Sequence, residues 1–100
     1  MDIGKTQDSG KVTLKLTGNL DTSTAPQLQK ELIPLFSQVK LVELDFSGVD
    51  YISSTGLRVL FTGHEAANSK GAQMSLCGVP DKIMEILIMT GFSDIFNITG

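Results

Sequence analysis

The sequence DFSGVDYISSTGL, residues 45–57, joins the end of an apolar run to the start of a helical pattern. The run consists of Leu41, Val42, Leu44 and Phe46. It predicts a strand over 41–46, followed by a turn of Ser, Gly and Asp residues. A helix is expected from about residue 54 to residue 69. The hydroxyl residues Ser53, Ser54 and Thr55 therefore belong at or beside a helix N-terminus.

A serine at a helix N-terminus can act in two ways. It can cap the helix by accepting a hydrogen bond from a backbone N–H, which is worth about 1 kcal/mol. It can also carry a phosphate, because unpaired N–H groups and the helix dipole favour an anion there. Both roles are open for Ser54. A Ser-His-Asp triad that contains Ser54 is excluded, because His64, the only histidine, lies about 15 Å away along the same helix.

The rest of the chain alternates between strand and helix patterns. The expected elements are strands at 2–7 and 12–17, a helix starting at 22–26, the strand at 41–46, the helix at 54–69, a strand at 72–77, a helix at 80–91 and a last strand or tail at 92–98. Residues 18–21 are expected to break the second strand, and Pro34 to kink or shorten the first helix. This order predicts an α/β fold: one small domain with a mixed, mainly parallel sheet of about four to five strands and three to four helices packed on it. It allows all the helices to lie on one face.

Composition excludes several classes of protein. One domain is expected over residues 1–100, and 41% hydrophobic against 19% charged residues indicate a folded chain. A net charge of -3 with scattered Lys and Arg argues against nucleic-acid binding. No apolar run approaches the roughly 20 residues that span a bilayer, and the N-terminus lacks a signal-peptide pattern. Cys77 is the only cysteine, so no intrachain disulfide forms. We expect a cytoplasmic protein.

Three aspartates could together form a second functional site. Asp21 and Asp45 are expected near strand carboxyl ends, where open parallel sheets bind ligands, and Asp50 follows the apolar run. They predict either a metal or acid–base cluster, or simple turn and cap chemistry. No His or Cys pair stands at zinc-ligand spacing, so we expect no metal and no cofactor. His64 is expected to pack beside its helix's inward stripe. The third helix is apolar on nearly every side, which leaves an exposed patch for a protein partner open.

Three motifs in order cover the whole chain. They are Gly18-Asn19-Leu20-Asp21 followed by Ala25, then Asp45-x-Ser47-x-Val49-x-Tyr51-Ile52-Ser53-Ser54-Thr55-Gly56-Leu57-x-x-Leu60, and finally Leu87-x-x-Thr90-Gly91-Phe92 followed by Phe96-x-Ile98. This pattern resembles the STAS domain family, and specifically its stand-alone anti-sigma factor antagonists.

The resemblance implies a small α/β domain with a regulatory function. Members bind an anti-sigma factor that is also a serine kinase, and this binding releases the sigma factor. The kinase phosphorylates a serine at the start of the second helix, and a metal-dependent serine phosphatase reverses the modification. On this chain the phosphoacceptor falls on Ser54, with Thr55 beside it. Members usually carry Asp immediately before the acceptor, where this chain has Ser53, so Ser53 remains the alternative acceptor.

The expected partner surface combines two segments. Its residues are Asp21, Thr22, Ser23 and Thr24 in the first loop, and Ser53, Ser54, Thr55 and Arg58 at the helix start. The chain is expected to have no catalytic residue and to be a monomer or weak dimer. Two other functions remain open. One is a STAS subunit that docks a lipid-transport ABC complex or a stress-signalling assembly without phosphorylation. The other is a nucleotide sensor, although no glycine-rich phosphate loop is present.

Overall fold

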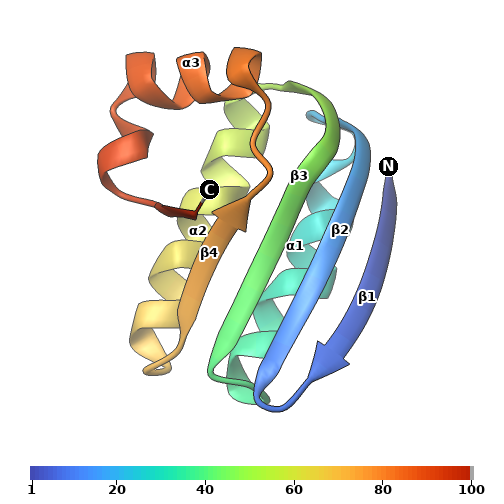
Figure 1. Cartoon of the computed structure of the whole chain (residues 1–100), viewed down its shortest axis with the longest axis vertical. Helices are drawn as coiled ribbons and strands as arrows, with labels where there is room; N and C mark the ends of the chain where they lie inside the picture. Colours follow the sequence, from blue (N-terminus) through green and yellow to red (C-terminus); the bar gives the residue numbers. More distant parts are fainter. Residues whose placement is uncertain (100) are drawn as a thin grey trace.

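The computed structural model describes residues 1–99 as five strands, three α-helices and two short 3-10 helices (Figure 1). In chain order they are β1 (Asp2–Asp8), β2 (Lys11–Leu20), α1 (Ala25–Leu32), η1 (Ile33–Ser37), β3 (Leu41–Ile52), α2 (Ser54–Ser69), β4 (Gln73–Cys77), α3 (Asp81–Thr90), η2 (Phe92–Asp94) and β5 (Asn97–Thr99). The sheet has the order β1-β2-β3-β4-β5. β1 pairs antiparallel with β2, and the other pairs are parallel. The predicted α/β fold with a mixed, mainly parallel sheet is confirmed.

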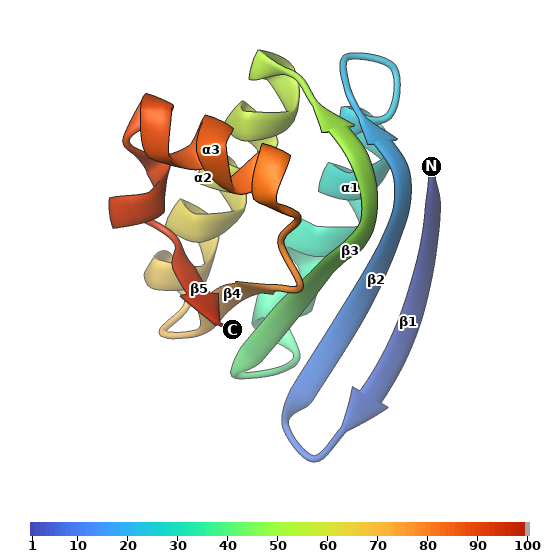
Figure 2. The same cartoon turned by 45° about the horizontal axis from the view of Figure 1, so that its top comes forward.

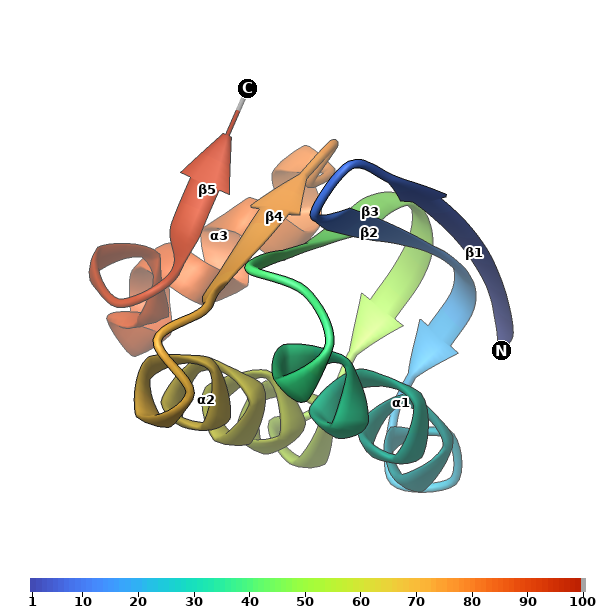
Figure 3. The same ribbon diagram turned by 90° about the horizontal axis from the view of Figure 1, so that it is seen from below.

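α1 and α2 lie side by side on one face of the sheet (Figure 3). Alternate residues of the two central strands are buried on that side, namely Val12, Leu14 and Leu16 of β2 and Val42, Leu44 and Phe46 of β3. The opposite side carries polar residues such as Lys11 and Glu43, which form an ion pair of 3.3 Å. This alternation is what a sheet with one solvated face requires.

α3 does not share that face. It crosses the carboxyl end of β4, at the top of Figure 1, and adds Ile83 and Leu87 to the same hydrophobic core. Gly78 precedes it with a φ of 62°, a left-handed conformation that turns the chain at the end of the strand. The arrangement with all helices on one face is therefore wrong.

β2 and β3 are longer than the sequence predicts. The expected break after residue 17 and the expected turn after residue 46 are both wrong, because the strands stay paired up to Leu20 and Ile52. Two register shifts in this half of the ladder accompany a strong bend of both strands toward α1 and α2 (Figure 3). Gly48 permits the close approach, since a Cβ there would lie 2.9 Å from the Leu16 carbonyl oxygen. Residues that resemble a turn are thus a bulged part of the sheet.

Helix ends follow their proline and glycine residues. α1 ends at Leu32 and continues as the 3-10 helix η1, which contains Pro34, so the predicted shortening is confirmed. α2 has the predicted bounds. Gly71 and Gly91 follow α2 and α3 with φ of 68° and 82°, as left-handed C-terminal residues do. The segment expected as a strand or tail over 92–98 contains η2 and only a short strand, β5.

The first turn of α2 is fixed by a cap and by a close contact. Ser53 is extended, with φ -97° and ψ 173°, and its Oγ accepts a hydrogen bond of 3.2 Å from the Gly56 N–H. This is N-capping, and it satisfies one of the unpaired donors of the helix. Gly56 is buried against β2, where a Cβ would lie 2.7 Å from the Leu20 carbonyl oxygen and 2.9 Å from Leu20 Cγ. α2 approaches the end of β2 this closely because residue 56 has no side chain.

Gly56→Ala should destabilise the protein by about 1–2 kcal/mol, because the backbone of β2 must yield to the new methyl group. The better helix propensity of alanine, about 1 kcal/mol, offsets only part of this cost. Urea denaturation measures the difference. Gly4→Ala is the matched control, since its Cβ meets only Lys15 Cβ at 3.9 Å. Equal stability of the two variants would contradict the close contact.

Ser53→Ala should cost about 1 kcal/mol through loss of the cap, whereas Ser53→Asp should keep it because a carboxylate oxygen caps equally well. Thermal unfolding of the two variants beside the unmodified protein provides the test. A Ser53→Ala protein that unfolds at the wild-type temperature would show that the cap contributes nothing.

Candidate functional site

Two loops meet where β2 and β3 end. Leu20 and Ile52 are partners in the parallel ladder, so the segments that follow them run side by side (Figure 2). The Ser53 N–H donates a hydrogen bond of 2.9 Å to the Leu20 carbonyl. The hydroxyls of Thr22 and Thr55 share a hydrogen bond of 3.2 Å. Residues 21–24 and 53–58, which are far apart in the sequence, therefore form one continuous surface.

Ser54 is the first residue of α2, and its side chain is exposed. None of the side-chain hydrogen bonds found among residues 1–99 involves its hydroxyl, whereas the neighbouring Ser53 is half-buried and serves as the cap. The free N–H groups of the first turn and the helix dipole favour negative charge here. A group added to Ser54 would break no existing contact, while the same group on Ser53 would remove the cap of α2.

Asp21 orders the loop after β2. Its Oδ1 accepts hydrogen bonds from the N–H groups of Ser23 and Thr24 at 3.0 and 3.2 Å, and from the Ser23 hydroxyl at 2.8 Å. These bonds, above all the one from the Ser23 hydroxyl, lower the pKa of Asp21, so the carboxylate is ionised at neutral pH. The loop consequently holds the exposed Thr22 in place beside Thr55.

The hydroxyl of Thr24 does not cap α1. Thr24 occupies the N-cap position, but its Oγ1 donates to the Asn19 carbonyl at 2.7 Å. Asp21 provides the acceptor for the nearby N–H groups instead. Thr24 is therefore half-buried and braces the loop, and Thr22 and Ser23 are the hydroxyl residues that this loop exposes.

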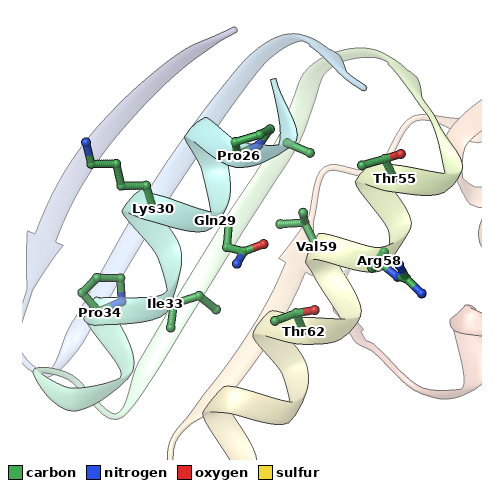
Figure 4. Close-up of a pocket in the computed structure, with 10 residues that line it drawn as sticks. Pro26, Gln29, Lys30, Ile33, Pro34, Thr55, Arg58, Val59 and Thr62 are labelled. Atoms are coloured by element: carbon green, nitrogen blue, oxygen red, sulfur yellow. The ribbon is translucent and has the colours of Figure 1, made fainter. Parts of the chain in front are cut away.

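A groove begins beside this surface and runs between α1 and α2 (Figure 4). Its volume is about 560 Å³. Thr55, Arg58, Val59 and Thr62 line it from α2; Ala25, Pro26, Gln29 and Lys30 line it from α1, with Ile33 and Pro34 from η1. Arg58, expected in the partner surface, is exposed one turn into α2. The sequence did not predict the α1 side of the groove.

The three carboxylates do not form a cluster. Asp45 is the fifth residue of the twelve-residue β3 rather than near its end, so its expected position is wrong. Its Oδ1 accepts a hydrogen bond of 2.9 Å from the Ser47 N–H, which is the main reason that the pKa of Asp45 is lowered. Asp50 is exposed on β3. Among residues 1–99 no group of three or more His, Cys, Asp or Glu side chains is arranged to hold a metal ion.

Two further expectations concern packing. His64 is half-buried against Phe96, with ring centroids 6.0 Å apart, and its Nε2 lies 3.3 Å from Asn68 Nδ2, so it packs as expected. On α3, Ile88 and Met89 are 60% and 82% exposed, which makes them an apolar patch. Within the described part of the chain, no helix is both long enough and apolar enough to cross a membrane.

Comparisons with known proteins agree with this architecture. Residues 2–99 match the STAS domain family. The chain is 30% identical over 97 residues to the anti-sigma-B factor antagonist of Listeria monocytogenes, covering 94% of this chain and 83% of the relative. A crystal structure of an anti-sigma factor antagonist from Mycobacterium paratuberculosis superposes with a TM-score of 0.85 at 18% identity, over 97% of this chain and 83% of that one.

A second structure, the Bacillus cell fate determinant SpoIIAA in its phosphorylated form, superposes with a TM-score of 0.76 at 13% identity. It covers 99% of this chain and 92% of SpoIIAA. At these identities the two structures establish a shared fold. Because the family match spans nearly the whole chain and the observed fold agrees with it, the chain belongs to the STAS domain family.

Proposed function

We propose that this protein is an anti-sigma factor antagonist. It binds an anti-sigma factor that is a serine kinase, releases the sigma factor, and loses this affinity when Ser54 is phosphorylated. The observation that carries the proposal is the exposed Ser54 hydroxyl at the start of α2, beside the Asp21–Thr24 loop. The Listeria relative is named as an anti-sigma-B factor antagonist, and SpoIIAA has a phosphorylated form. The protein acts in the cytoplasm as a monomer or weak dimer.

Ser54 is a better acceptor than Ser53 for a physical reason. The Ser53 hydroxyl is half-buried and caps α2, so a kinase would have to disrupt the first turn to reach it. Ser54 is exposed one residue later and leaves the cap intact. A serine at position 53 therefore preserves the geometry of the helix start, although members of the family usually carry Asp there.

The reaction relies on the partner for its chemistry. A hydroxyl nucleophile needs a nearby base, and the only histidine lies ten residues further along α2. The kinase supplies ATP, magnesium and the base, while this chain supplies the acceptor oxygen. A serine phosphatase acting on the phosphorylated form restores the active antagonist. The protein itself is not an enzyme.

Phosphorylation acts on the interface rather than on the fold. The phosphate adds about -1.5 to -2 charges at pH 7. The N-terminus of α2 tolerates that charge, because the helix dipole favours it. A partner that covers the site must desolvate the phosphate beside the ionised Asp21. A loss of only about 2.8 kcal/mol in binding free energy weakens the complex about 100-fold.

Incubation with the cognate serine-kinase anti-sigma factor, ATP and magnesium should add the mass of one phosphate to the wild-type protein. Ser54→Ala should gain none, and Ser53→Ala should still be modified. Intact-protein mass spectrometry measures all three. Phosphate on Ser53 would move the switch by one residue. No mass gain with any serine-kinase anti-sigma factor would favour a subunit that docks a transport or stress-signalling assembly without phosphorylation.

Ser54→Asp should weaken binding to the unmodified kinase at least about tenfold, because a fixed negative charge imitates part of the phosphate. Ser54→Ala should bind as the wild type does. Isothermal titration calorimetry gives both dissociation constants. Ser9→Asp is the matched control, since Ser9 is exposed in the β1–β2 turn at the other end of the sheet. Equal affinities of Ser54→Asp and Ser9→Asp would remove position 54 from the switch.

A further inference from the structure

The groove between α1 and α2 is a built feature of the fold. Beneath it the helices are in tight contact, because a Cβ on Gly63 would lie only 2.7 Å from Cδ2 of the fully buried Leu32. The residues that line the groove leave a space of about 560 Å³ between the two helices. Pro26 and Val59 give this space an apolar lining, from opposite helices (Figure 4).

The charges around the groove have one sign. Lys30 and Arg58 are its only charged lining residues, one on each helix, and no carboxylate lines it. Both side chains are exposed, and in Figure 4 they extend outward on opposite flanks. The ion pair found within residues 1–99 joins Lys11 to Glu43, so neither cation is neutralised by a described carboxylate. The protein as a whole has a net charge of -3, but the groove has an apolar lining with positive charges on both sides.

The groove is continuous with the surface around Ser54. Thr55 follows Ser54 in the chain, lines the groove, and shares a hydrogen bond of 3.2 Å with Thr22. A macromolecule that covers Ser54 therefore reaches the near end of the groove without crossing another element.

We propose that this groove binds an acidic amphipathic segment of the same anti-sigma factor, an inference that rests on the proposed function. Apolar side chains of that segment occupy the space between α1 and α2, and flanking carboxylates pair with Lys30 and Arg58. Segments of this kind bind grooves by burying an apolar stripe, while charges at the rim steer association and fix orientation. The groove thus supplies affinity that does not depend on the Ser54 hydroxyl.

The test uses the purified anti-sigma factor that binds the wild-type protein. Lys30→Glu should weaken this binding about tenfold, and Thr62→Trp, which fills the groove, should weaken it by a similar factor. Lys82→Glu is the matched control, because Lys82 is an exposed lysine on α3 and should leave the dissociation constant unchanged. Circular dichroism verifies that each variant is folded. The loss in Lys30→Glu should shrink at high salt.

A cross-linking experiment identifies the occupant. Gln29→Cys in a Cys77→Ser background carries a maleimide photo-cross-linker into the groove. The expected product is a cross-link to a carboxylate-rich amphipathic segment of the anti-sigma factor. A cross-link to a basic segment, or to a second copy of this chain, overturns the inference.

The outcomes separate the two proposals. Wild-type affinity in both Lys30→Glu and Thr62→Trp, together with phosphorylation at Ser54, overturns the groove and leaves the function intact. Absence of binding by the wild-type protein to any serine-kinase anti-sigma factor overturns both.

Discussion

One backbone carbonyl, that of Leu20, sets the geometry of the site. It is the last acceptor of β2, and it receives the Ser53 N–H at 2.9 Å, one residue beyond the end of β3. The absent side chain of Gly56 lets the first turn of α2 rest against the same atom. An unpaired carbonyl buried at this point would be costly, so the hydrogen bond and the close packing are maintained together. They determine where α2 begins and therefore which hydroxyl faces the solvent.

From this constraint follows a division of roles between two adjacent serines. The Ser53 hydroxyl accepts a hydrogen bond from the Gly56 N–H and so caps α2. Ser54 is exposed and does not take part in this cap. A regulatory modification needs such an arrangement, because a group whose change alters binding should contribute little to the stability of the fold.

Two features surround Ser54: a loop ordered by Asp21, and a groove with positively charged sides. The Asp21 carboxylate accepts three hydrogen bonds from Ser23 and Thr24, and its pKa is lowered, so it orders the loop without a helix or strand. Next to the loop, the groove between α1 and α2 has an apolar lining, with Lys30 on one side and Arg58 on the other. The surface thus presents a negative group in the loop and positive groups along the helices. Such a pattern defines the orientation in which a partner can bind.

The sequence by itself determined where helices begin and end. Helical periodicity after a run of hydroxyl residues predicted the bounds of α2, and Pro34 predicted the shortening of α1; which of the two serines caps the helix and which is exposed stayed open at that level. Only the tertiary structure decided the length of β2 and β3, the mid-strand position of Asp45, the crossing of α3 and the groove. Caps, turns and periodicity depend on neighbours within a few residues. A Ser-Gly-rich segment such as Ser47-Gly48, by contrast, becomes a strand when a distant strand supplies its hydrogen-bond partners, and a groove exists only once two helices have packed together.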